Sequence, residues 1–187
     1  MKGISIGPLV AMIVAGSATA GEIADKATQA ESLVANGKYI EAVEALEGAM
    51  TSLWDKLPLS FRKALWIAAP ARGFGNYTPR ETNAYLAGDE MIAYAEPVGF
   101  GWRKVGDMWQ NDFAADVTLT TKDGKHFHTQ KDVGKGGMLS RVRNREYNIR
   151  LTITLTDIPA GEYMANFKVH DAVSGKSGTF SLPFVIK

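Results

Sequence analysis

The stretch Tyr147-Asn148-Ile149-Arg150-Leu151-Thr152-Ile153-Thr154-Leu155 decides the fold, because apolar and polar residues alternate along its nine positions. Successive side chains of a β-strand point to opposite faces, so this alternation predicts a strand with one dry and one wet face. The same pattern recurs at residues 163–169 and 180–186. Such strands are typical of antiparallel sheets that pack on one another and leave one face to solvent.

Turn signals divide the chain after Pro58 into further short strands. Gly88 and Gly124 stand in the turn sequences Ala-Gly-Asp and Lys-Asp-Gly, and residues 171–176 form a hairpin loop before the last strand. Seven or eight short strands at this spacing predict an antiparallel β-sandwich of immunoglobulin-like type over residues 58–187. A closed barrel is the alternative. The predicted fold class is mainly β, preceded by an α-helical hairpin.

The first twenty residues, 1–20, have the pattern of a signal peptide. Lys2 gives a positive start, residues 4–16 are mostly apolar, and Ala18-Thr19-Ala20 offers a cleavage site before Gly21. The apolar run is too short to span a bilayer, which takes about 20 residues. We expect cleavage after Ala20 and a periplasmic or secreted mature protein. We expect no later membrane span, and no lipid anchor because no cysteine follows the cleavage site.

Residues 21–57 are strong helix formers and predict an antiparallel helical hairpin that turns at Asn36-Gly37. We expect this hairpin to pack on the rest of the protein. A docking surface for a partner or for a second copy is the alternative. Apolar residues recur at helical spacing in both halves, at Ile23, Ala27, Ala30 and Val34 and then at Ile40, Val43, Leu46, Ala49 and Leu53.

Part of this segment resembles a single tetratricopeptide-type repeat. The resemblance covers residues 30–49, AESLVANGKYIEAVEALEGA, in which small residues let two helices approach closely and Tyr39 wedges the turn. It implies a helical hairpin rather than a peptide-binding superhelix, since about three repeats are needed for a stable solenoid. The matching positions are Ala30, Leu33, Gly37, Tyr39, Ala42, Leu46 and Ala49.

The C-terminal part carries a second resemblance. Residues 158–163, IPAGEY, and the loop Asp171-Ala172-Val173-Ser174-Gly175-Lys176 are similar to the last two strands of bacterial extracellular Ig-like domains. Residues 60–187 also resemble an uncharacterised family of proteobacterial periplasmic proteins. That likeness rests on Ala69-Pro70, Tyr77, Pro79-Arg80, Gly88-Asp89, residues 94–100, Asn144-Arg145-Glu146 and residues 177–184. It implies a fold and a compartment but no activity.

The composition excludes several classes of protein. Hydrophobic residues make up 45% of the 187 residues, which is too many for a mainly disordered chain. The formal net charge is +1, so the chain has no general affinity for nucleic acid. The absence of cysteine excludes a disulfide scaffold, a Cys-ligated metal and a thiol nucleophile. We expect no cofactor.

Residues 73–112 are rich in aromatic side chains that stand among glycines. Aromatic loops on a sandwich can stack on sugar rings or on apolar side chains of a protein, while a neighbouring Arg fixes a hydroxyl or carboxylate. The alternative is that these aromatics fill the core. The candidate partner-binding residues of this region are Tyr77, Arg80, Phe100, Trp102 and Trp109.

Arg141, Arg143 and Arg145 alternate, so on a strand they would present three guanidiniums on one face. Such a face can meet an acidic partner, an anionic polysaccharide or lipid headgroups. The alternative is a solvated edge strand that discourages aggregation between sheets.

His126 and His128 would share one face of a strand and could ligate a metal, with His170, Asp123 or Asp132 as a third ligand. A polar edge strand is the alternative. No Gly-x-Ser-x-Gly, His-Glu-x-x-His or dinucleotide-binding motif is present in the sequence. The leading hypothesis is therefore a non-catalytic binding or assembly module that engages a protein or glycan partner in the cell envelope. The alternative is a small metal-binding protein or hydrolase that uses His126 and His128 with loop carboxylates.

Overall fold

A computed structural model describes residues 21–187, so the expected signal peptide at residues 1–20 lies outside the described residues. The fold is mainly β with an N-terminal pair of helices, as predicted. The chain divides into two compact units, the first ending at Met50 and the second comprising Thr51–Lys187. This division lies within the second helix rather than after residue 57, because Trp54 of that helix is buried in the core of the second unit.

The helical hairpin is confirmed. Helix α1 (Glu22–Ala35) and helix α2 (Tyr39–Lys56) are joined at the expected turn, where Gly37 has a φ of 70°. Among the described residues of the first unit, 21–50, the buried apolar residues are three alanines, Ala30, Ala42 and Ala49. Small side chains allow close approach of the two helices but bury little apolar area. Neither helix within residues 21–187 combines the length and apolar character that crossing a membrane requires.

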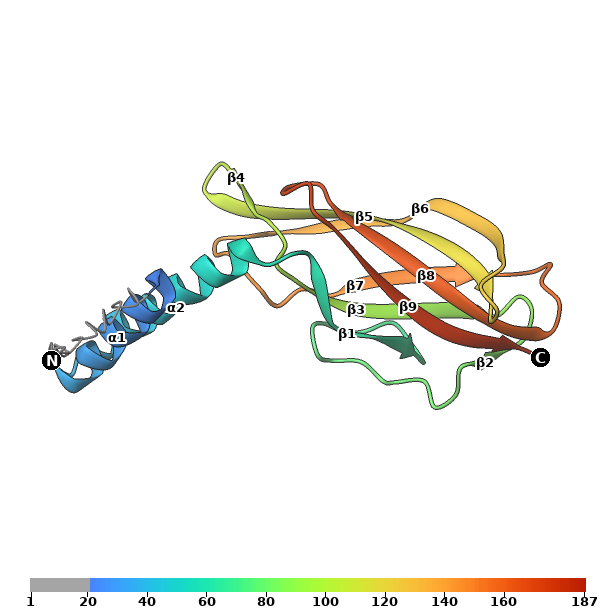
Figure 1. Cartoon of the computed structure of the whole chain (residues 1–187), viewed down its shortest axis with the longest axis horizontal. Coiled ribbons are helices and arrows are strands. Elements are labelled where there is room, and N and C mark those ends of the chain that lie inside the picture. Colours follow the sequence, from blue (N-terminus) through green and yellow to red (C-terminus); the bar gives the residue numbers. More distant parts are fainter. Residues whose placement is uncertain (1–20) are drawn as a thin grey trace, which may run out of the picture. The chain divides into compact units, whose positions relative to one another are not determined.

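Two sheets make up the second unit (Figure 1). The smaller is antiparallel, with the order β1 (Ser60–Ile67), β3 (Glu90–Val98) and β7 (Ile149–Thr154). The larger sheet has the order β2 (Ala84–Tyr85), β9 (Ser177–Ile186), β8 (Gly161–Asp171), β5 (Met108–Thr121) and β4 (Arg103–Val105). A sixth strand, β6 (His126–Ser140), also pairs with β5.

The two-sheet sandwich was predicted, and it differs from the prediction in two details. It has nine strands rather than seven or eight, since the short strands β2 and β4 add to the predicted set. Strand β2 runs parallel to β9, whereas the other paired strands of the described chain are antiparallel.

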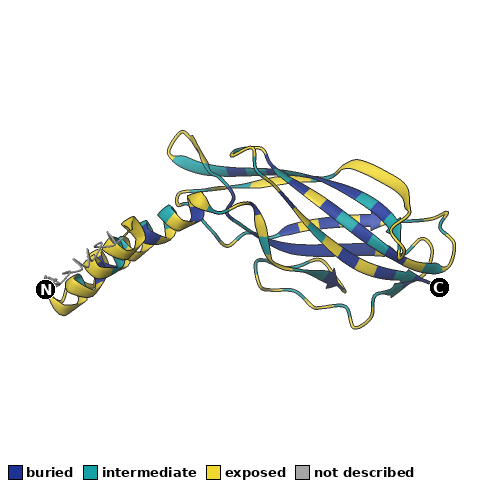
Figure 2. Ribbon diagram, in the orientation of Figure 1, coloured by how far each residue is buried: buried dark blue, intermediate teal, exposed yellow. Residues whose placement is uncertain are grey.

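The alternation that predicted the sandwich is visible in the burial of β7 and β8. Ile149, Leu151 and Ile153 are buried and face the other sheet, while the residues between them are exposed (Figure 2). Strand β3 departs from this rule, because residues 91–97 are all buried. A loop covers its outer face, and Tyr77 of that loop lies against Tyr94 with ring centroids 4.3 Å apart.

Candidate functional site

Two tryptophans and an arginine that the sequence singled out meet on the sandwich. The Arg143 guanidinium lies 4.3 Å from the ring centroid of Trp109 and 6.0 Å from that of Trp102. Lys104 places its ammonium 4.6 Å from the same Trp109 ring. We call these four residues, Trp102, Lys104, Trp109 and Arg143, the Trp–Arg cluster. Cation–π contacts of this length are attractive.

Trp102 packs against Trp54 at the end of α2 and against Phe100. Trp54, in the last turn of α2, donates a hydrogen bond from Nε1 to the Phe100 carbonyl at 2.9 Å. The Trp54 ring lies 5.3 Å from Phe100 and 5.7 Å from Trp102. Lys176 joins the same segments, because its Nζ donates hydrogen bonds to the carbonyls of Asp55, Leu57 and Gly99 at 3.2, 2.7 and 2.8 Å.

Carboxylates balance the arginines of this corner. Arg143 is 3.8 Å from Asp55, and Arg141 forms an ion pair of 2.6 Å with Asp107. Because two cations already contact the Trp109 ring, a sugar that stacked on it would displace one of them. The cluster is therefore a less open platform than the sequence suggested, and its guanidiniums do not form a free positive strip.

The prediction that Arg141, Arg143 and Arg145 lie on one strand is wrong. Strand β6 ends at Ser140, and residues 141–148 have no strand structure, so Arg141, Arg143 and Arg145 do not share one strand face. Their side chains diverge instead. Arg141 reaches Asp107, Arg143 lies over Trp109, and Arg145 donates to the Thr51 hydroxyl at 2.8 Å.

The remaining aromatic candidates are dispersed. Phe100 is 1% exposed and belongs to the core, as the alternative interpretation had it. Tyr77 packs on Tyr94 over the outer face of the smaller sheet. Arg80 lies 4.1 Å from the ring centroid of Tyr85, whose pKa is raised to about 12 by burial. The predicted platform is thus divided among separate parts of the sandwich.

The two candidate metal ligands lie on β6, away from a third histidine. His126 pairs with Thr120 of β5, and His170 pairs with Ala114 of the same strand. Six residues of a strand separate those positions by about 20 Å. His126 Nε2 is 2.8 Å from the Thr129 hydroxyl. Within residues 21–187, no group of three or more His, Asp or Glu side chains is placed to hold a metal ion.

His170 belongs to a polar network that sequence analysis did not find. Its Nε2 lies 3.2 Å from Asp116, and its Nδ1 lies 3.1 Å from the Ser177 hydroxyl. Lys131 donates to the same Asp116 oxygen at 2.8 Å, and the Asp132 N–H donates to the other at 3.0 Å. These donors hold the pKa of Asp116 well below its usual range, chiefly through Lys131. Asp116 of β5 contacts Lys131 and Asp132 of β6 and His170 of β8, and His170 also contacts Ser177 of β9. The network therefore links these four strands on the solvent face of the sheet.

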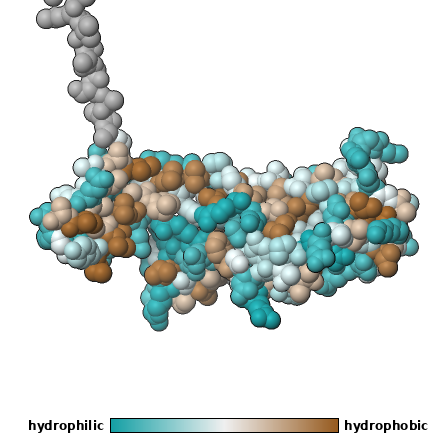
Figure 3. Space-filling view, turned by 90° about the horizontal axis from the view of Figure 1, so that it is seen from below, coloured by the Kyte–Doolittle hydropathy of each residue, from teal (hydrophilic) through white to brown (hydrophobic). Residues whose placement is uncertain are grey.

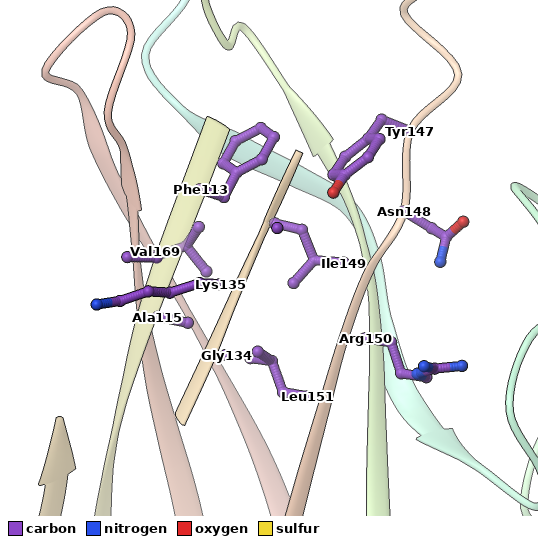
Figure 4. A pocket seen from close by; sticks show the side chains of 12 residues that line it. Phe113, Ala115, Gly134, Lys135, Tyr147, Asn148, Ile149, Arg150, Leu151 and Val169 are labelled. Atoms are coloured by element: carbon purple, nitrogen blue, oxygen red, sulfur yellow. The ribbon is translucent and has the colours of Figure 1, made fainter. Parts of the chain in front are cut away.

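A narrow cavity of about 240 Å³ opens between β6 and β7 (Figure 4). It is smaller than the usual ligand pocket of about 300–1,000 Å³. Figure 4 shows Lys135 and Arg150 extending away from it on opposite sides, so no cation points into it. We interpret the cavity as an open end of the core. Its apolar wall consists of Phe113, Ala115, Ile149, Leu151 and Val169.

Several large apolar side chains are exposed on the helical hairpin. Tyr39, Val43, Leu46 and Met50 are 66, 54, 52 and 44% exposed, and they follow one another at intervals of four, three and four residues along α2. We call these four residues the apolar stripe. Figure 3 shows apolar side chains gathered over the hairpin at the left of the view. The sequence had marked Val43 and Leu46 as apolar but did not indicate that they face solvent.

No protein-family model and no curated protein matches the chain. Some solved structures show distant likeness. CopC from Methylosinus trichosporium is 13% identical, with 69% of this chain and 93% of that protein covered and a TM-score of 0.31. A conjugative transposon lipoprotein from Bacteroides eggerthii is 12% identical, covering 69% and 98%, with a TM-score of 0.30. The sporulation control protein Spo0M from Bacillus subtilis is 12% identical, covering 70% and 50%, with a TM-score of 0.34.

Proposed function

We propose that the protein is a non-catalytic assembly module of the cell envelope, which binds a protein partner through the apolar stripe of α2. The observation that carries this proposal is the exposure of Tyr39, Val43, Leu46 and Met50 on one side of a helix. Contiguous apolar surface on a soluble domain is typical of a site of association with another protein.

The composition of the hairpin supports the same conclusion. Its two helices meet through alanines, whereas the larger apolar residues of the stripe are directed to solvent. Most helical stability in proteins comes from packing of an apolar face, and alanine contributes little to such packing. The hairpin therefore gains more from a partner that covers the stripe than from its own interface.

The proposed compartment rests on the leader-like residues 1–20. Membership of the proteobacterial periplasmic family that residues 60–187 resemble remains part of the proposal.

Thiol labelling tests this function directly, because the chain contains no cysteine. Leu46→Cys places a thiol in the stripe, and Val142→Cys places a matched thiol at a site that is 65% exposed on the sandwich. We expect a maleimide to label both purified variants at similar rates. In cells of the native host, Leu46→Cys should react about tenfold more slowly, which corresponds to about 90% occupancy. Equal rates for both variants in cells would refute the proposal.

The Trp–Arg cluster supports a second candidate function, the binding of a glycan. Trp102 Nε1 is buried and has no hydrogen-bond partner among the described residues, so a hydroxyl or carboxylate that reached it would satisfy the donor. Trp102→Ala/Trp109→Ala should then abolish binding in a glycan titration. Binding that survives in the double variant, or no binding by the parent protein, would remove this candidate.

A further inference from the structure

We infer that the partner segment that docks on the apolar stripe is a basic amphipathic helix, which lies in the groove between α1 and α2 and completes a three-helix bundle. This inference rests on the proposed function and adds the chemical class of the partner. Three features carry it: the shape of the groove, the spacing of the stripe and the charge of the hairpin.

The groove has the form that receives a helix. A depression of about 380 Å³ lies between the two helices, with Ala27, Ala30 and Val34 of α1 on one side and Leu46 of α2 on the other. The small alanines leave room for the large side chains of an incoming helix. Helix-in-groove recognition uses this arrangement, in which large residues of one helix enter the spaces between small residues of others.

The stripe has the spacing of a coiled-coil seam. Its four residues recur at alternating intervals of four and three residues, which is the period that keeps a seam facing a neighbouring helix. From Tyr39 to Met50 the seam runs for about 16 Å along the helix axis. Ile40, beside the stripe, is 72% exposed and widens the apolar surface toward the beginning of α2.

The charge of the hairpin selects the partner. Residues 21–50 contain six acidic and two basic side chains, a net charge of −4. Lys26 is already paired with Glu22 at 3.0 Å. Glu31 lines the groove and forms no ion pair with any described residue. Lysine or arginine beside the apolar face of a partner helix would meet this carboxylate and the net negative charge of the hairpin.

A second copy of the chain fits this surface less well. Packing two hairpins stripe to stripe would bring two units of net charge −4 together, and such like-charge contacts oppose association. The acidic groove therefore favours a different chain that carries positive charge along an amphipathic helix.

Two synthetic peptides test the inference against the full-length mature protein. Both have the 18-residue length of α2 and leucine at the seam positions, and they carry either lysine or glutamate at the other positions. We expect the lysine peptide to bind about tenfold or more tightly than the glutamate peptide by fluorescence anisotropy. Raising the salt from about 0.05 M to about 0.5 M should reduce that difference.

Variants locate the binding. Val43→Ser/Leu46→Ser should weaken the lysine peptide about tenfold or more, whereas the control Leu139→Ser/Val142→Ser, at exposed sites on the sandwich, should not change its affinity. Glu31→Gln keeps every apolar residue of the groove and should weaken binding of the lysine peptide, while leaving binding of the glutamate peptide unchanged or improved.

Each contrary outcome has a distinct meaning. Equal affinities for the two peptides would overturn the inference about charge and leave the proposed function standing. If the protein forms a dimer and Val43→Ser/Leu46→Ser makes it monomeric, a second copy of the chain occupies the stripe, and the inference is overturned. Failure of both peptides, together with unhindered labelling of Leu46→Cys in cells, would overturn both the inference and the proposed function.

Discussion

Lys176 should contribute more to stability than an ordinary surface lysine. Its ammonium donates to three carbonyls, those of Asp55, Leu57 and Gly99, which belong to the end of α2, the segment before β1 and the turn after β3. The substitution Lys176→Met keeps the length of the aliphatic stem but leaves these carbonyls without the donor. It also removes a cation from the C-terminal end of α2, where positive charge is favourable.

The magnitude follows from those contacts. The bonds to Leu57 and Gly99 are half-buried, and each unsatisfied buried carbonyl costs about 1–3 kcal/mol, while the Asp55 carbonyl is open to water and costs little. Because both bonds are only half-buried, the lower part of the summed range applies, and we expect Lys176→Met to lower the free energy of unfolding by about 2–4 kcal/mol. Urea denaturation followed by tryptophan fluorescence measures this, with an unchanged m-value as evidence of two-state unfolding.

Lys168 provides the matched control. It is exposed on β8, and its side chain forms no hydrogen bond or ion pair with a described residue. Lys168→Met should therefore stay within about 0.5 kcal/mol of the parent. If Lys176→Met also stays within about 0.5 kcal/mol, or if both variants lose the same amount, the three carbonyl contacts do not stabilise the corner as we argue.

Three further predictions concern the sandwich. Asp116→Asn should reduce the free energy of unfolding by about 1–3 kcal/mol at pH 7, because Lys131 and His170 lose their charged acceptor. The pKa of Asp116 is lowered in the folded state, so its contribution is present above the unfolded value of about 3.9 and is lost as the pH falls below it. Urea titrations should therefore show the Asn variant and the parent converging toward pH 2, and a difference that stays constant with pH would contradict this. Gly99→Ala should lower the melting temperature more than Gly175→Ala does. Both glycines have a positive φ, of 79° and 73°. The new Cβ at residue 99 would lie 2.5 Å from the Pro58 carbonyl oxygen, whereas the new Cβ at residue 175 would meet open space. Equal losses would show that the segment before β1 moves aside. Purified protein should hold no stoichiometric zinc or copper by elemental analysis, since His126 and His128 have no third ligand among the described residues. Metal that is lost in His126→Ala/His128→Ala would restore the metal-binding alternative.

Local patterns predicted the sandwich because each strand face is decided within a few residues. The alternation of Ile149, Leu151 and Ile153 requires one buried face, and β7 has it. The burial of both faces of β3 could not be predicted in this way, since a separate loop covers the second face, with Tyr77 against Tyr94. The predicted strand through Arg141 and Arg143 failed because the end of a strand depends on its partner strand, which local alternation does not reveal. The pairing of β6 with β5 ends at Ser140 and Trp109.

The candidate site was predictable in part. Composition identified Trp102, Trp109 and Arg143, and the structure brings these three together. Composition could not distinguish the two tryptophans from Phe100, which fills the core, because all three residues are aromatic and stand in the same glycine-containing region.

The apolar stripe carried a signal that periodicity alone did not resolve. Helix α2 has two apolar faces, one of small residues such as Ala42 and Ala49 and one of larger residues such as Val43 and Leu46. Close packing of two helices favours the face of small residues. The difference in side-chain size therefore indicates which face remains for a partner.

Amide hydrogen exchange tests the central claim most directly. The full-length mature protein is measured alone and with the lysine peptide, and exchange is compared over Tyr39 to Met50 and over the strands of the sandwich. We predict that the peptide slows exchange in α2 and leaves β5 and β8 unchanged, because the partner covers the stripe and stabilises the hairpin. Unchanged exchange in α2, or protection confined to the sandwich, would contradict the account.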